Sequence, residues 1–445
     1  MKIAPAGDRA VLAVVGDVPA AELHGLAAAI RNLPGVVACI AGHSSLYVIF
    51  HTAPDVDAIR GARVSSPALP PAAKHLVTVS FRDDDAPDLP ELLAAARITR
   101  DDLLRRVAAL RLVVRYLGFR GGFGYLDGWP PEWSMPRRPT SRPRVAAGTF
   151  AAAGAVAGFY PIDSPGGWNL LGRTSHPLEH ALTPGDEIVI VPTLAPLEKN
   201  GGTPASSPAP PFPLELIASP LSQIVTAPDW SRTLRGLPPG GPFDDVAAAH
   251  ANRAAGNQAG APILESALTG PRAVARRDVI CSWFGADVEI TAGGRPVDDI
   301  RQFAVREGEE IRAGRITNGL RGYLAAGPVR GEIEPLLRGD RLEIRAVAGP
   351  HESEVRDLVC EVSPQLDRVG IRMRLVAPAG AEAPATLASC GMQCGSVQLH
   401  PDGSVVAMGP DHPVTGGYLQ PMTVMTSERW KLAQLVPGDI VSFRA

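Results

Sequence analysis

The chain has 445 residues, which is too long for one hydrophobic core and predicts two to four domains. Its hydrophobic residues make up 45% and its charged residues 20%, as in a globular protein, while 46 glycines and 44 prolines favour many short strands joined by turns. The net charge of -3 argues against a nucleic-acid partner, because such a partner normally meets a basic face.

Residues 1–75 are expected to form a small α+β domain. The run RAVLAVVG predicts a strand, AAELHGLAAAIRNL a helix with apolar positions on one face, and VVACIAGHSSLYVIF two strands that turn at Gly42–Ser44. We interpret His43 in that turn as structural, since no partner for it is visible in the sequence. Asp8 and Arg9 interrupt the first apolar stretch, so no signal peptide is expected, and no apolar run reaches the length that crosses a bilayer.

The next segment predicts a strand, LVTVSF, and two helices, PELLAAARI and TRDDLLRRVAALRLVV. Thr99 is a good N-cap for the second helix, because Asp101 and Asp102 follow in its first turn. The acidic run DDDAPD before the helices is interpreted as a solvated loop, since its spacing does not resemble a calcium loop.

Residues 117–177 concentrate glycines, arginines and aromatic residues. The arginines alternate with prolines, which hold the chain extended, and the aromatic side chains supply flat contact surface. Tight turns and a solvated face would explain the same composition. We interpret the segment instead as a strand-rich module whose loops form a polar pocket.

Two sets of turns recur in the same order in the two halves of the chain. In each set a Gly-Gly-aromatic turn precedes a Pro-Gly-Asp turn that leads into a final strand. The turns are Gly166-Gly167-Trp168 and Pro184-Gly185-Asp186 in the first half, and Gly416-Gly417-Tyr418 and Pro437-Gly438-Asp439 in the second. The repeat predicts two related β-barrels, and the Pro-rich residues 194–213 between them predict a linker.

The motifs resemble a known family. In the first half LGFRGGFGYL, PRRPTSRPRVAAG and SPGGWNLLGRT look like subunit 1 of the allophanate hydrolase family. That family includes small 5-oxoprolinase subunits, kinase-A-inhibitor-type proteins and part of the carboxyltransferase unit of urea carboxylase. In the second half AHANRAAGN, WFGADVEITAGGRPV, VSPQLDRVGIRM and DHPVTGGY resemble subunit 2.

The resemblance implies a fused subunit 1 and subunit 2 chain, mainly β with α+β. The expected fold has cyclophilin-like barrels in two lobes. The implied domains are an N-terminal α+β domain at 1–75, a first barrel at 76–193, the linker at 194–213, and a carboxyltransferase domain with cyclophilin-like barrels at 214–445. The sequence departs from the family pattern at Gly121 and at Leu419-Gln420, and it lacks a Gly-Ser-rich segment after RGYLAAG. Such losses could lower turnover while leaving the barrels intact.

Several side chains are candidates for chemistry. Arg138, Arg144 and Arg173 each offer a planar fork to a carboxylate or phosphate, and an ordinary surface ion pair is an equally open explanation for each. His412 is a candidate general acid or base, and Asp287 could accept a proton. No phosphate-binding GxxxxGK[ST] loop is present, and Cys390 and Cys394 lack the further ligands of a metal site, so no metal is expected.

By resemblance, the chain would be an ATP-dependent C–N amide or lactam hydrolase, or a component of one, which opens 5-oxoproline to glutamate. It would use ATP, a small anionic amide or lactam substrate and a further 5-oxoprolinase-type subunit; homo-oligomerisation is left open. The alternatives are a regulator of a histidine kinase and a biotin-dependent carboxyltransferase domain acting on urea or an amide. Five scattered cysteines are consistent with a cytoplasmic protein.

Because the family's two subunits work as a pair, we expect the pocket to lie where the two lobes face each other. The first lobe would contribute Phe119, Arg138, Arg144, Trp168 and Arg173. The second lobe would contribute Asp287, His412, Thr415, Gly416, Gly417 and Tyr418.

Overall fold

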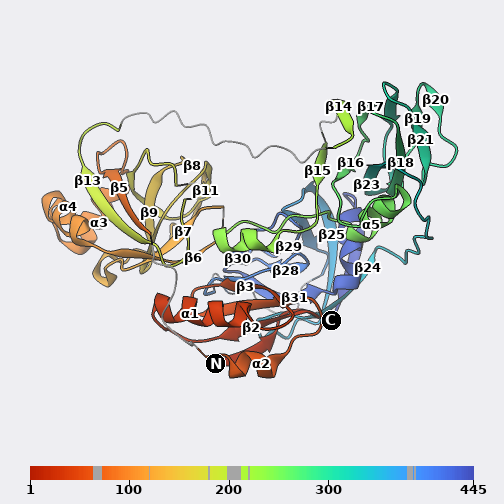
Figure 1. The fold of residues 1–445 in the computed structure, drawn as a ribbon. Coiled ribbons are helices and arrows are strands. Elements are labelled where there is room, and N and C mark those ends of the chain that lie inside the picture. Colours follow the sequence, from red (N-terminus) through yellow and green to blue (C-terminus); the bar gives the residue numbers. More distant parts are fainter. Residues whose placement is uncertain are drawn as a thin grey trace.

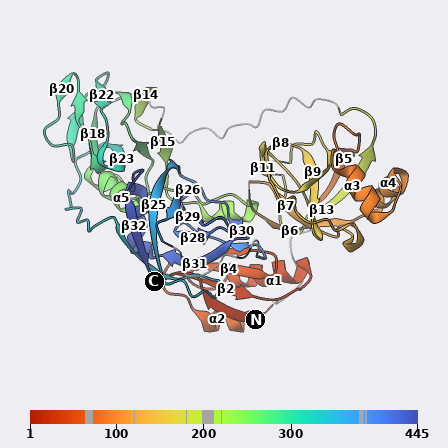
Figure 2. The same ribbon diagram turned by 180° about the vertical axis from the view of Figure 1, so that it is seen from behind.

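The structure is a computed structural model that describes residues 1–63, 73–119, 121–178, 181–197, 212–218, 221–377, 384 and 387–445. The molecule is U-shaped (Figures 1 and 2), with a first barrel in one arm and two packed sheets in the other. An N-terminal α+β unit and a second barrel lie between the arms at the base. Among the described helices, none is long and apolar enough to cross a membrane.

The N-terminal unit is an antiparallel four-stranded sheet of order β1-β2-β4-β3 with helix α1 packed on it. Apolar side chains on one face of α1 pack against the sheet, including Leu23, Ala27 and Ile30. The elements are β1 (Lys2–Pro5), β2 (Ala10–Val14), α1 (Ala20–Arg31), β3 (Val36–Ala41), β4 (Ser45–Phe50) and α2 (Val56–Gly61).

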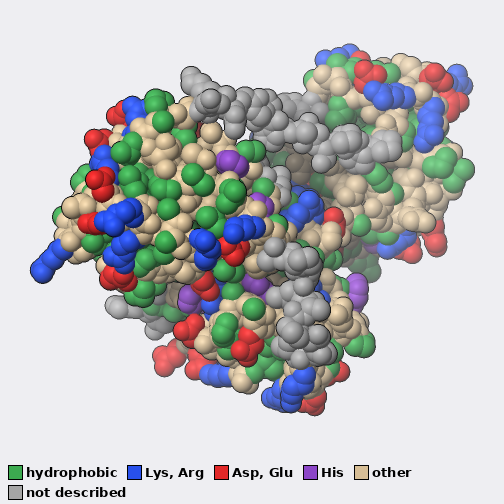
Figure 3. Space-filling model, turned by 60° about the vertical axis from the view of Figure 1, so that its left-hand side comes forward, with side chains coloured by type: hydrophobic (Ala, Val, Ile, Leu, Met, Phe, Trp, Pro, Cys, Tyr) green, Lys and Arg blue, Asp and Glu red, His purple; other side chains and the backbone are tan. Residues whose placement is uncertain are grey.

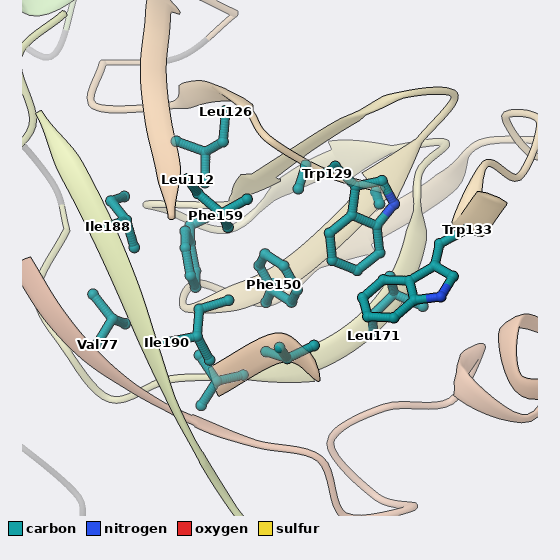
Figure 4. Close-up of a cluster of buried hydrophobic side chains, with 14 of the residues drawn as sticks. Val77, Leu112, Leu126, Trp129, Trp133, Phe150, Phe159, Leu171, Ile188 and Ile190 are labelled. Carbon is teal, nitrogen blue, oxygen red and sulfur yellow. The ribbon is translucent and has the colours of Figure 1, made fainter. Parts of the chain in front are cut away.

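The first barrel closes in the order β10-β7-β6-β13-β5-β12-β9. Large apolar side chains fill its interior (Figure 4). Helices α3 and α4 add apolar side chains to the same core. Its elements are β5 (Lys74–Ser80), α3 (Leu89–Ala96), α4 (Arg100–Ala109), β6 (Leu112–Leu117), β7 (Gly124–Asp127), η1 (Pro131–Trp133), β8 (Arg142–Val145), β9 (Thr149–Ala153), β10 (Val156–Phe159), β11 (Ser164–Gly166), β12 (Asn169–Arg173) and β13 (Glu187–Thr193).

The second predicted helix of this barrel begins as expected and ends early. Thr99 caps it by accepting a hydrogen bond from the Asp102 backbone, in a full capping box. The helix ends at Ala109, and the following LRLVV enters β6, where its apolar side chains are needed in the barrel core. Helical spacing alone could not locate this boundary, because the apolar run continues through it.

The second half opens with two five-stranded sheets, β14-β17-β22-β19-β20 and β15-β16-β23-β18-β21, which share one core. Trp283 points into that core and Phe284 points to the other face, where α5 packs. The elements are β14 (Leu214–Ala218), β15 (Ser222–Val225), η2 (Trp230–Arg235), α5 (Asp245–Ala254), β16 (Ile263–Ala267), β17 (Arg272–Ala275), β18 (Val279–Asp287), β19 (Ile290–Ala292), β20 (Arg295–Pro296), β21 (Phe303–Val305), β22 (Glu310–Ala313) and β23 (Thr317–Gly327).

The second barrel closes in the order β24-β31-β28-β29-β26-β25-β32. Its elements are β24 (Glu343–Ala348), β25 (Asp357–Leu366), β26 (Gly370–Leu375), β27 (Cys390–Gly391), β28 (Ser396–Leu399), β29 (Ser404–Met408), β30 (Thr415–Gly416), β31 (Leu419–Val424), η3 (Thr426–Glu428), α6 (Arg429–Gln434) and β32 (Ile440–Arg444). The prediction of a mainly β protein with one closed barrel in each lobe is confirmed.

The two barrels have the same connectivity, as the turn repeat predicted. Each is closed by a parallel pair, β5 with β13 and β24 with β32, and the order of the remaining strands matches around the ring. The Gly185 N–H donates to the Val114 carbonyl over 2.8 Å, and the Gly438 N–H donates to the Val362 carbonyl over 2.9 Å. The Gly-Gly-aromatic turns precede the equivalent strands β12 and β31. Most of the predicted linker, residues 198–211, lies outside the described residues.

Candidate binding site between the two halves

The loop after β6 brings the first barrel against the second half. Its backbone folds sharply, with Phe119 at φ 62° and Gly122 at φ 80°, and the Gly118 N–H donates to the Phe123 carbonyl over 3.2 Å. A Cβ on Gly118 would lie only 1.6 Å from Thr415 Oγ1, on β30. Glycine is therefore required at 118, because the loop backbone lies directly on Thr415.

Thr415 brings a buried polar atom to this contact. Its side chain is 3% exposed, and its Oγ1 has no hydrogen-bond partner within the described part of the chain. The adjacent turn is held by the Leu387 N–H, which donates to the Gly417 carbonyl over 2.8 Å. A Cβ on Gly416 would lie 2.6 Å from Gln398 Nε2, so this turn is also closely packed. A buried hydroxyl without a partner is costly, and a ligand that paired with it would remove that cost.

Aromatic side chains cover the first-barrel side of the contact. Phe123 lies edge to face with Phe119, at 5.6 Å between ring centroids, and with Trp168, at 5.3 Å. Trp168 also lies 5.6 Å from Tyr125. These side chains lie outside the barrel core, in a cluster of their own. Strands β6 and β7 lie on the side of the first barrel that faces the second half (Figure 1), and the molecular surface is hollowed between the two halves (Figure 3).

The N-terminal unit also takes part in the contact between the first barrel and the second half, which the sequence did not indicate. The His43 N–H donates to the Ser389 carbonyl over 2.8 Å, and the His43 carbonyl accepts from Arg115 Nε over 2.6 Å. Its ring lies edge-on to Tyr116 at 6.4 Å, and Tyr116 stacks on Tyr125 at 4.2 Å. His43 therefore joins all three parts of the molecule, and its position in a turn gave no signal of this.

Most of the predicted arginines form ion pairs with carboxylates of their own barrel. Arg138 Nη1 lies 3.0 Å from Asp88 Oδ1, and Arg142 holds both oxygens of Asp88 at 2.7 and 2.9 Å. Arg144 pairs with Asp163 at 2.6 Å, where Asp163 also accepts from the Ala147 N–H. These contacts favour the ion-pair explanation for Arg138 and Arg144.

Arg138 has a structural role, which its proline-rich surroundings did not indicate, because it pairs with a buried carboxylate. Asp88 is 3% exposed and also accepts from the Leu170 N–H over 2.7 Å. Charge reversal at Arg138 would place a new carboxylate beside the buried Asp88 and the nearby Glu91, so we expect it to destabilise the first barrel. Arg173, at the end of β12, is exposed and has no ion pair with any described residue.

His412 lies on the same loop as Thr415 and is 1% exposed. Its Nδ1 lies 2.8 Å from the Pro413 carbonyl, so Nδ1 carries the proton and Nε2 presents a lone pair. Burial lowers the pKa of His412 to about 4, and nearby Arg429 acts in the same direction. The side chain is neutral at pH 7, so it could accept a hydrogen bond there but could not act as a general acid.

Two other predicted residues lie apart from the contact. Asp287 is the last residue of β18, in the arm opposite the first barrel (Figure 1), where it accepts from Asn318 Nδ2 over 2.6 Å. The structure does not bring it to Thr415. Tyr418 stacks on His400 at 4.1 Å, on the second-barrel side. An open depression on the β19 and β22 sheet contains none of the predicted residues in its lining.

Two barrels of one connectivity, joined at a contact that neither half completes alone, define a two-lobed carboxyltransferase type of chain. Residues 1–181 match the family described as "Carboxyltransferase domain, subdomain C and D". Residues 235–358 and 334–445 match "Carboxyltransferase domain, subdomain A and B". The chain belongs to this family, in the form that fuses the subunit 1 and subunit 2 types of allophanate hydrolase.

Individual relatives agree with this assignment. The chain is 32% identical to a 5-oxoprolinase subunit of Escherichia coli O157:H7 over 180 residues, which cover 38% of this chain and 83% of that protein. It is 34% identical to a 5-oxoprolinase subunit of Bacillus subtilis (strain 168) over 98 residues, which cover 22% of this chain and 41% of that protein. It is 32% identical to urea amidolyase of Saccharomyces cerevisiae over 99 residues, which cover 22% of this chain and 5% of that protein.

Among solved structures, TTHA0988 superposes with a TM-score of 0.84 and 26% sequence identity. The superposition covers 98% of this chain and 99% of that one. The whole two-lobed arrangement is therefore shared, including the arm that carries the two packed sheets.

Proposed function

We propose that this chain is a component of an ATP-dependent enzyme of the 5-oxoprolinase type, which opens the lactam of 5-oxoproline to glutamate. The observation that carries the proposal is the contact of Gly118 with Thr415, where a buried hydroxyl without a partner among the described residues meets a glycine-rich loop that also carries Phe119 and Phe123 of the aromatic cluster. The likeness to the 5-oxoprolinase subunits of Escherichia coli and Bacillus subtilis supports the choice of substrate.

In this proposal the chain binds and orients the lactam. The Thr415 hydroxyl would donate to the lactam carbonyl or accept from its N–H, and the aromatic cluster would cover the ring's apolar atoms. The neutral His412 would serve as an acceptor only. Asp287 is not assigned a catalytic role, since it lies in the opposite arm.

ATP would supply the activation of the lactam carbonyl. The candidate phosphate ligands of the first barrel do not fit this role well, because Arg138 and Arg144 are already paired with Asp88 and Asp163. We therefore derive no step through ATP on this chain, and we propose that a partner subunit of the 5-oxoprolinase type holds it.

Calorimetry with 5-oxoproline, on the full chain alone and mixed with such a partner subunit, tests the proposal. We expect 5-oxoproline to bind, and glutamate to form only when the partner and ATP are both present. If neither preparation binds 5-oxoproline nor forms glutamate, the proposed substrate is wrong.

A second candidate is a carboxyltransferase acting on urea or another amide. The observation that favours it is the family description itself, together with the likeness to urea amidolyase. This role requires a biotin carrier outside residues 1–445, because a Met-Lys-Met biotin site does not occur in them. Binding of free biotin by the full chain, without binding of 5-oxoproline, would favour this candidate over the first.

A further inference from the structure

The short helix η2 lies at the contact between the two halves. Its C-cap, Gly236, packs on the first barrel, since a Cβ there would lie 2.6 Å from Leu117 Cβ and 3.4 Å from the Gly118 backbone nitrogen. η2 also packs against β3 of the N-terminal unit. The helix therefore touches the same loop, at Gly118, that lies on Thr415.

Arg232 extends from η2 toward the loop that carries Thr415. Its backbone is fixed, because the Leu237 N–H donates to the Arg232 carbonyl over 3.1 Å. A Cβ placed on Gly240 would lie 3.5 Å from Arg232 Nη1 and 4.0 Å from Asp411 Oδ1, which are ordinary contact distances. The open side of Gly240 is therefore bordered by a guanidinium and a carboxylate, with room for a small group beside them. Asp411 and Thr415 are on the same loop, which joins β29 to β30.

Arg232 has no carboxylate of its own. It is partly buried, and none of the carboxylates in the described ranges forms an ion pair with it. Asp411 is held instead by Arg368, at 2.8 and 3.1 Å. Asp229, which caps η2, accepts from the Ser231 N–H over 3.0 Å. Both neighbouring carboxylates are engaged by other groups, so the guanidinium keeps its donors for a ligand.

The charges around Asp411 favour an anionic ligand. Arg368 also lies 2.7 Å from the buried Glu265, and Arg321 lies 3.7 Å from the same carboxylate. The carboxylates of Asp411 and Glu265 are thus balanced by two arginines before Arg232 is considered. Arg232 adds a positive charge that this cluster does not neutralise. A guanidinium in this state can hold a carboxylate with two parallel hydrogen bonds.

We propose that Arg232 binds the carboxylate of a small acid at the contact between the halves. The inference rests on the proposed function for the identity of the acid, 5-oxoproline, and extends it by naming a specificity residue. Arg232 would favour the acid over a neutral lactam of the same ring, because a ligand without the carboxylate leaves the guanidinium unpaired. Recognition of the lactam bond would remain with Thr415.

The test compares three probes on the full chain by calorimetry: 5-oxoproline, cyclopentanecarboxylate and 2-pyrrolidinone. The second has the ring and the carboxylate but no lactam, and the third has the lactam but no carboxylate. Arg232→Ala should weaken binding of both acids by about tenfold or more, the usual effect of losing a charge-assisted hydrogen bond, and should leave 2-pyrrolidinone unchanged. Arg232→Lys should recover part of the loss, since it keeps the charge without the fork. Thermal unfolding of each variant checks that it is folded.

Arg235→Ala is the matched control. Arg235 is on the same helix and also lacks an ion pair within the described part of the chain, but its side chain is exposed. Its replacement should change the affinity of each acid by less than about twofold. Equal weakening by Arg235→Ala would show a general charge effect and would overturn the assignment to Arg232.

The remaining outcomes separate this inference from the proposed function. If cyclopentanecarboxylate binds in an Arg232-dependent way while 5-oxoproline does not bind, the site stands and the proposed substrate is wrong. If both acids bind equally well to wild type and Arg232→Ala, the role of Arg232 is wrong and the proposed substrate stands. If Arg232→Ala weakens 2-pyrrolidinone as much as the acids, or if neither acid binds the wild-type chain, Arg232 is not a carboxylate site.

Discussion

At the scale of single residues, charge alone did not identify the site. Arg138 and Arg144 have the chemistry of anion ligands, yet each is held by a carboxylate of its own barrel. His412 is a histidine in a matching loop, yet burial keeps it neutral. For each of these residues the neighbours, rather than the side-chain type, decide what chemistry is available at pH 7.

The buried state of His412 predicts a pH dependence of stability. Its pKa is about 4 in the folded chain and about 6.5 when unfolded, so the unfolded chain binds more protons between these values. The free energy of unfolding should therefore fall as the pH is lowered through this window, by up to about 3 kcal/mol for this one group.

Replacing His412 by Asn should make that dependence shallower. Denaturant unfolding at about pH 7, 6 and 5 measures the slope for both proteins. His24, His351 and His400, whose pKa values burial also lowers, contribute to the slope of both and serve as the common background. Identical slopes would mean that His412 does not titrate as a buried histidine.

At the scale of elements, the connections between parts depend on a few buried groups. Arg115 on β6 is 4% exposed and contacts two loops of the N-terminal unit and strand β7. It donates to the His43 carbonyl over 2.6 Å, to the Val18 carbonyl over 2.9 Å and to Asp127 over 2.7 Å. One side chain thus fixes the N-terminal unit on the first barrel.

Arg115→Met should cost about 3 to 5 kcal/mol of stability, because it leaves Asp127 and two carbonyls without their partner. Arg111→Met, just before the same strand, removes an exposed pair with Glu187 and exposed hydrogen bonds to the Ala109 and Leu110 carbonyls, and it should cost less than about 1 kcal/mol. Chemical denaturation of both variants gives the comparison. A similar small loss in both would contradict the bridging role of Arg115.

Gly118→Ala tests the contact between the halves in the same way. The added Cβ would collide with Thr415, so the loop must shift, and binding of any ligand at the contact should weaken by about tenfold or more. Gly339→Ala is the control, since a Cβ there meets no atom within 4 Å. Calorimetry with 5-oxoproline on both variants is the measurement; equal affinities would show that the loop tolerates a side chain.

At the scale of the whole molecule, the two halves are joined through the N-terminal unit as well as through the covalent chain. The Ala6 carbonyl accepts from Thr423 Oγ1 over 2.9 Å, and Asp8 accepts from Thr426 Oγ1 over 3.0 Å. β4 also packs against β27, beside the hydrogen bond from His43 to Ser389. The beginning of the chain is therefore bound to the second barrel.

Limited proteolysis should cut first within residues 192–213, whose Pro-rich composition is typical of an exposed linker, and should give fragments of about 190 and 230 residues. Because the N-terminal unit holds the second barrel, we expect the two fragments to elute together in gel filtration under native conditions. Elution as two separate species would contradict the strength of this interface, and protection of the segment from several proteases would contradict the predicted linker.

Local sequence determined the elements and the repeat. The apolar face of α1, the capping box at Thr99 and the two Pro-Gly-Asp turns act within a few residues, so pattern alone could identify them. The family motifs, which are also local, predicted the two barrels.

Only the tertiary structure decided which side chains meet. The end of α4 at Ala109 depends on the barrel core, and the pairing of Arg138 with Asp88 joins residues 50 positions apart. Arg137 and Arg138 are the same residue type in adjacent positions, so no pattern could tell which one pairs with the buried Asp88. The position of Asp88 in the fold decides this pairing, because a charged side chain pairs with the groups near it in space rather than with its neighbours in sequence.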